Sequence, residues 1–130
     1  IWFHTEDRKV HPREGILRLL AKGISLDAVV CYNDQIAMQI IPALASRGIR
    51  VPEDISVTGY DNSCMAMGDG FHLTTIVHPQ EKLGEMAAQL LLSLLRGETL
   101  QPEQSKILIQ PELVVGNSCC GIFTSKYTTC

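Results

Sequence analysis

Asp27-Ala-Val-Val-Cys-Tyr-Asn-Asp34 and Ile55-Ser-Val-Thr-Gly-Tyr-Asp-Asn62 are the two stretches that decide the fold. In each, an apolar run ends in two polar residues that are suited to a turn. A helical pattern that stops at Gly48 lies between them, and this strand–helix–strand order predicts two parallel strands in one sheet. Both polar turns then lie at the carboxyl edge of the sheet, where open α/β sheets bind their ligands.

These turns place Asn33 and Asp61 at one edge of the sheet, with Tyr32 at the end of the first strand. A carboxylate accepts hydrogen bonds from hydroxyls, and an amide both donates and accepts them. The pair therefore suits a small neutral polyol such as a sugar. Residue types alone leave other interpretations open: a helix cap at Asn33 or Asp34, an ordinary turn at Asp61, and core packing for Tyr32.

The remaining pattern predicts further elements on both sides of these stretches. A first helix begins at Pro12 and ends before Gly23, and the strand at 28–32 has the continuous apolar pattern of a strand buried on both faces. The strongest helical period is that of the leucine-rich segment at 81–96. Further strands are predicted at 55–60, 73–77, 106–110 and 113–115, and we expect a loosely held tail at 117–130.

Composition excludes several classes of function. The chain has 130 residues, 45% hydrophobic and 19% charged, with a net charge of −3, which fits one soluble globular domain or part of one. Binding of nucleic acid by this segment needs clustered Lys and Arg, which are missing, and the apolar stretch at 90–95 is too short to span a membrane. The first residue is not Met, so we expect a fragment of a larger protein.

The chemistry-bearing residues give no sign of a metal, a cofactor or catalysis. The five cysteines form no Cys-x-x-Cys pair and the four histidines do not have metal-ligand spacing, so we expect reduced thiols in a cytoplasmic protein. A nucleophile elbow and a phosphate-binding glycine loop are also missing from the sequence. An α/β enzyme is therefore a weaker interpretation than a binding domain.

Four motifs carry a resemblance to a known family. They are Asn33-Asp-Gln-Ile-Ala37, Gly48-Ile-Arg-Val-Pro-Glu-Asp-Ile-Ser-Val57, Gly59-Tyr-Asp-Asn62 and Leu73-Thr-Thr-Ile76, followed by Leu83-Gly84. In this order and spacing they resemble the effector-binding domain of the lactose/galactose-repressor family. Cys31-Tyr-Asn-Asp34, His78-Pro79 and Pro111-Glu-Leu-Val-Val115 are similar to the arabinose-responsive repressors in particular.

The resemblance implies a periplasmic-binding-protein-like α/β fold, a parallel sheet flanked by helices, of which this chain supplies mainly the carboxyl-terminal lobe. Residues 1–72 would belong to that lobe, 73–98 would be a hinge strand and a helix of the other lobe, and 106–116 would return. A small sugar, L-arabinose by the closer resemblance, would bind between the lobes. Operator DNA would be bound by an amino-terminal domain absent from this chain, in a homodimer.

The resemblance also implies roles for single residues. Asn33 and Asp61 become sugar contacts, while Asp34 keeps the capping role. His78 matches a position near the hinge that can face the cleft, although a solvated or packed histidine is an equal alternative. Tyr32 could stack on a sugar face.

The dimer interface of the family matches the Met38 and Ile41 side of the second helix, with Met65 and Met67 in the following loop. Ordinary core packing is the alternative, since Met fills irregular gaps as readily as contact surfaces.

For the whole protein, the main rival interpretation is a periplasmic sugar-binding protein of a transporter, which shares the fold.

Overall fold

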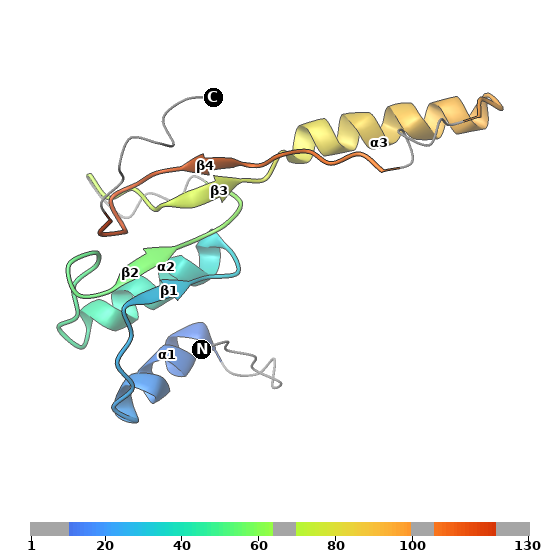
Figure 1. Ribbon diagram of the computed structural model, residues 1–130. Coiled ribbons are helices and arrows are strands. Elements are labelled where there is room, and N and C mark those ends of the chain that lie inside the picture. Colours follow the sequence, from blue (N-terminus) through green and yellow to red (C-terminus); the bar gives the residue numbers. More distant parts are fainter. Residues whose placement is uncertain (1–10, 64–69, 100–105, 122–130) are drawn as a thin grey trace.

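The computed structural model describes residues 11–63, 70–99 and 106–121. Helices and strands alternate along the chain except at β2 and β3, which follow one another, and this order is that of an α/β fold (Figure 1). In chain order the elements are α1 (Pro12–Ala21), β1 (Ala28–Val30), α2 (Asp34–Ala45), β2 (Ser56–Thr58), β3 (Thr75–Val77), α3 (Gln80–Leu95) and β4 (Glu112–Val114). The predicted helices are confirmed, and the predicted strands are shorter. Residues 106–110 form no strand, so that prediction is wrong.

The helices begin and end where the sequence provides stop signals. Pro12 opens α1, where its fixed φ and missing N–H cost nothing. Helix α2 ends at Ala45, and Gly48, three residues later, has φ +74°, a left-handed value that glycine adopts without strain. Pro42 lies inside α2, which nevertheless continues to Ala45.

The strands form two pairs that one bridge joins. Strand β1 runs parallel to β2, with Ala28 opposite Ser56 and Val30 opposite Thr58. Thr58 also forms a parallel bridge to Thr74, just before β3, and β3 pairs antiparallel with β4. The predicted parallel pair with a crossover helix is thus confirmed, and the carboxyl ends of β1, β2 and β3 point the same way.

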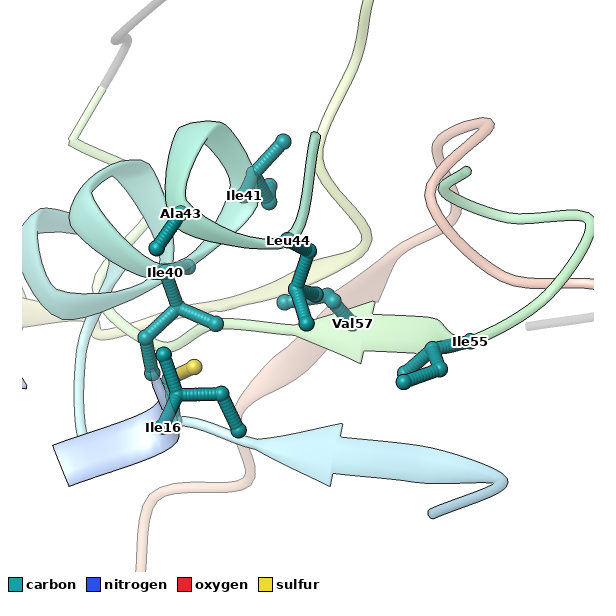
Figure 2. Packing of buried hydrophobic residues seen from close by; sticks show 9 residues of the cluster. Ile16, Ile40, Ile41, Ala43, Leu44, Ile55 and Val57 are labelled. Carbon is teal, nitrogen blue, oxygen red and sulfur yellow. The ribbon is translucent and has the colours of Figure 1, made fainter. Parts of the chain in front are cut away.

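The hydrophobic core lies between α2 and one face of the sheet, with α1 packed against α2 (Figure 1). Figure 2 shows Ile16 and Ile40 in one part of this core and Leu44 with Val57 in another, and all four belong to one buried cluster. The cluster consists of Ile16, Cys31, Ala37, Ile40, Ile41, Ala43, Leu44, Ile55 and Val57. Leu44 and Val57 are fully buried.

The opposite face of the sheet is uncovered in the part of the chain that the structure describes. Val30 is 83% exposed and Tyr32 is 85% exposed, so the prediction that the first strand is buried on both faces is wrong for this chain. The physical reason is that, among residues 11–63, 70–99 and 106–121, α2 covers one face of β1 and β2 pairs with one of its edges. Core packing of Tyr32 is excluded by the same exposure.

Helix α3 extends away from the sheet (Figure 1) and has no buried residue. Most of its leucines are open to solvent, from 39% exposed at Leu83 to 75% at Leu95, and Leu90 is half-buried. Within the described ranges no helix is both long enough and apolar enough to cross a membrane.

Residues just after β4 are tied to the sheet, unlike the loose tail that the sequence suggested. Ser118 is fully buried, its Oγ donates to the Val57 carbonyl at 2.6 Å and accepts from the Thr74 N–H at 2.8 Å. The Asn117 N–H donates to the His72 carbonyl at 2.8 Å. The remainder of the predicted tail, 122–130, lies outside the described residues.

Leu44→Ala should lower the free energy of unfolding by about 2–5 kcal/mol, because it opens a cavity under α2 against Val57. Gln35→Ala, at an exposed position of the same helix, should change it by about 0.5 kcal/mol or less. Denaturant unfolding of both variants measures the difference. Equal effects would show that α2 does not pack on the sheet as described.

Candidate functional site

Backbone hydrogen bonds continue beyond the strand ends and bring three chain segments together. The Asp34 N–H donates to the Tyr60 carbonyl at 2.9 Å, which joins the turn after β1 to the turn after β2. The Asp61 N–H donates to the Ile76 carbonyl at 2.9 Å, which joins that second turn to β3. Asn33, Asp61 and the end of β3 therefore lie side by side at the carboxyl edge of the sheet.

Asn33 is the N-cap of α2. Its side-chain Oδ1 accepts a hydrogen bond from the Ile36 N–H at 3.0 Å, and its backbone is extended, as an N-cap requires. The capping role that the sequence gave to Asp34 therefore belongs to Asn33. The amide oxygen accepts this bond, and the Nδ2 group has no hydrogen-bond partner among the residues that the structure describes.

Asp34 is a buried carboxylate, only 3% exposed, that joins α2 to two distant segments. Its Oδ1 accepts from the Thr75 hydroxyl at 2.6 Å. Its Oδ2 accepts from the Ser63 N–H at 2.8 Å and from the Ser63 hydroxyl at 3.3 Å. A buried charge is tolerated only when it is hydrogen-bonded, and here the donors come from β3 and from the turn after β2.

Gly59 is required by the same carboxylate. A Cβ at this position would overlap Asp34 Oδ1 and press on the Leu73 side chain. Glycine is therefore needed at position 59 because the backbone after β2 passes close to Asp34, and the backbone of Gly59 is not left-handed.

The turn that carries Asp61 has an unusual backbone. Asp61 has φ +96° and Asn62 has φ +49°, values that Asp and Asn tolerate better than other residues with a Cβ. The turn is held by the Asp61 bond to Ile76 and by the Ser63 bond to Asp34. Within the described residues no side chain or N–H donates to the Asp61 carboxylate, so this acceptor is free to take donors from outside.

His78 follows β3 at the same edge and contacts Tyr60. The Tyr60 hydroxyl lies 3.3 Å from His78 Nδ1, and the two rings are 5.7 Å apart between centroids with a tilt of 52°. Both side chains are partly buried. Sequence reasoning predicted His78 as a site residue and missed Tyr60.

Tyr32, the remaining predicted site residue, lies on a different part of the surface. Tyr32 lines a shallow depression of about 200 Å³ on the uncovered face of the sheet, with Tyr60, Val30, Ile76 and Leu113 among its neighbours. Asn33, Asp61 and His78 do not line it. We place the candidate site at the sheet edge, where the polar groups converge, because the depression is largely an apolar sheet face without a covering layer.

The predicted dimer residues are only partly described. Met38 is half-buried on α2. Ile41 is 9% exposed and belongs to the core, so it has little surface left to offer a partner. Met65 and Met67 lie outside the described residues.

Comparison with known proteins places these features in a family context. Residues 3–119 match the model of the periplasmic binding protein-like domain family. An arabinose metabolism transcriptional repressor of Halalkalibacterium halodurans is 36% identical over 123 residues, which are 91% of this chain and 32% of that protein. The HTH-type transcriptional repressor PurR of Photobacterium profundum is 40% identical over 91 residues, 70% of this chain and 27% of that protein.

Solved structures show the same similarity. The lac repressor dimer bound to operator and the anti-inducer ONPF superposes with a TM-score of 0.74 at 29% identity, over 85% of this chain and 37% of that one. A complex of the transcriptional regulator CelR with cellobiose gives 0.71 at 31% identity, over 82% of this chain and 32% of that one. The chain spans about a third of the length of the curated repressors of arabinose metabolism that it matches.

Asp34→Asn should lower the free energy of unfolding by about 2–4 kcal/mol. The amide keeps only one acceptor oxygen, and its NH₂ group then faces a donor, either the Thr75 hydroxyl or the Ser63 N–H. Asp54→Asn is a matched control, since Asp54 is paired with Arg50 on the surface at 2.7 Å. The control should be much less destabilised in the same denaturant titration. An equal loss in both variants would refute the role given to Asp34.

Cys31 should make stability fall in alkaline solution. Burial, reinforced by the nearby charge of Asp34, raises the pKa of the Cys31 thiol from 9.0 to about 12. Above pH 9.0 the unfolded chain loses this proton while the folded chain keeps it, so the free energy of unfolding falls as the pH rises toward about 12. Comparing wild type with Cys31→Ala from pH 8 upward, by urea unfolding, isolates this slope, and equal slopes would contradict the prediction.

Proposed function

This chain belongs to the periplasmic binding protein-like domain family, and from that premise we propose that it is part of the sugar-sensing domain of a transcription repressor. The observation that carries the proposal is the meeting of Asn33, Asp61 and His78 at the carboxyl edge of the sheet. This edge is where open α/β folds bind their ligands.

The chemistry of the edge supports a neutral polyol as the ligand. Asp61 offers two carboxylate oxygens to hydroxyl donors, and Asn33 keeps its Nδ2 group as a donor because its oxygen caps α2. A hydroxyl both donates and accepts, so adjacent hydroxyls of one sugar ring can satisfy both groups at once. We propose L-arabinose as the sugar because repressors of arabinose metabolism are among the relatives.

The path of the chain after β3 supports a second lobe. Helix α3 leaves the sheet directly after Pro79 (Figure 1). It has no buried residue, and most of its leucines are exposed to solvent. Strand β4 then returns antiparallel to β3. We propose that 73–98 contain a hinge strand and a helix of the second lobe, and that 106–116 return to the first lobe.

The proposed mechanism is a shift between two arrangements of the lobes. A sugar that contacts both lobes favours the arrangement in which both sets of contacts form, by no more than its difference in affinity for the two arrangements. The change reaches operator DNA through a domain that this chain does not contain. Assembly as a homodimer would use the Met38 side of α2, with Met65 and Met67, and we expect only a minor contribution from the buried Ile41.

A regulator is favoured over the two rival functions by the comparisons. The relatives and solved structures described above are transcriptional regulators, and neither transport proteins nor enzymes are among them. We therefore propose no separate catalytic or transport function.

Asp61→Asn should weaken sugar binding by about 10- to 100-fold in the whole protein, because charge-assisted hydrogen bonds to hydroxyls are lost. Operator binding without sugar should be unchanged. Calorimetric titration with L-arabinose, and with xylose, galactose and ribose for comparison, measures the affinity.

Asp27→Asn is the control, because Asp27 is exposed at the opposite end of β1 and should leave the affinity unaltered. Wild-type affinity in Asp61→Asn would exclude the assigned carboxylate. If the wild-type protein binds none of the four sugars, the proposed ligand class is wrong.

A further inference from the structure

The contact between Tyr60 and His78 joins the ends of two neighbouring strands. The residues are 18 positions apart, and the Asp61 bond to Ile76 sets the register that brings them together. The Tyr60 hydroxyl lies 3.3 Å from Nδ1 of His78, and the rings pack at 5.7 Å with a tilt of 52°. The hydroxyl therefore meets one particular ring nitrogen and leaves the other, Nε2, unoccupied within the described residues.

We propose that Tyr60 is a positioning residue that holds the neutral form of His78 in the tautomer with hydrogen on Nε2, so that His78 presents a hydrogen-bond donor to the sugar. A neutral imidazole has one donor and one acceptor nitrogen, and the partner of the one fixes the role of the other. When the Tyr60 hydroxyl donates to Nδ1, the proton of the ring resides on Nε2. This inference rests on the proposed function of the edge as a sugar site.

The fixed tautomer complements the other groups at the edge. Asp61 can only accept hydrogen bonds when ionised, and the oxygen of Asn33 is engaged by the Ile36 N–H. The sugar oxygens that must accept bonds then have two donors, Asn33 Nδ2 and His78 Nε2–H. A sugar analogue that lacks the hydroxyl facing His78 would leave this donor unpaired, so Tyr60 contributes indirectly to the choice of sugar.

The first arm of the test observes the tautomer without any ligand. The whole protein is labelled with ¹⁵N-histidine, and the His78 signals are assigned by their loss in His78→Ala. We expect wild type to show a protonated Nε2 and an unprotonated Nδ1, and Tyr60→Phe to show a mixture of tautomers. Ser46→Ala is the control, because it removes a hydroxyl at an exposed position near the far end of α2, where it is bonded to the Ala43 carbonyl at 2.7 Å. It should leave the His78 signals unchanged.

The second arm measures L-arabinose affinity by calorimetry. Tyr60→Phe should weaken binding by about tenfold, as expected for one hydrogen bond that is no longer preorganised. The double variant Tyr60→Phe/His78→Ala should bind no more weakly than His78→Ala alone, because Tyr60 acts through His78. Ser46→Ala should bind like wild type.

Each result decides the inference. Identical His78 tautomers in wild type and Tyr60→Phe would overturn it, as would additive losses in the double variant or an unaltered affinity in Tyr60→Phe. If the wild-type protein binds none of the sugars, the proposed function fails and the sugar-contacting part of this inference fails with it. The tautomer spectra would still decide whether Tyr60 positions His78, so the two failures are distinguishable.

Discussion

The burial of one carboxylate is the constraint on which the site depends. Asp34 starts α2, yet its donors are Thr75 on β3 and Ser63 after β2. Satisfying a charge that is only 3% exposed therefore fixes a helix, a strand and a turn relative to one another. These hydrogen bonds also fix the position of the turn that carries Asp61, because Ser63 lies at the end of that turn. Gly59 is the steric counterpart, since any side chain there would collide with the carboxylate.

The order of the elements could be predicted from the sequence because its signals are local. Pro12, Gly48 and the period of the leucines mark helix boundaries by rules that depend on a few neighbouring residues. Burial could not be predicted in the same way. Val30 reads as a core residue, but its exposure depends on whether another layer covers that face of the sheet, which no local pattern specifies. The segment 106–110 likewise has strand-like residues without a described strand to pair with.

The sequence predicts the edge of the sheet at which the candidate site lies, but not the residues that hold the site in place. Asn33 and Asp61 could be placed together because parallel strands end at one edge. The cap predicted at Asp34 is formed by Asn33 instead, because both residue types are good caps and only the three-dimensional position of Thr75, 41 residues after Asp34, distinguishes them. Tyr60 was missed since its partner His78 belongs to another strand, and no spacing rule links a residue to a neighbour 18 positions ahead.

The tether formed by Ser118 and Asn117 has a mechanical consequence. Ser118 is bonded to Val57 and Thr74, and Asn117 to His72, so the segment after β4 is anchored beside the segment before β3. Between these anchors, β3 leads out to α3 and β4 leads back to the sheet. A rotation of α3 that keeps the buried hydrogen bonds of Ser118 has to change backbone torsions between the anchors, such as those around Pro79 and Pro111.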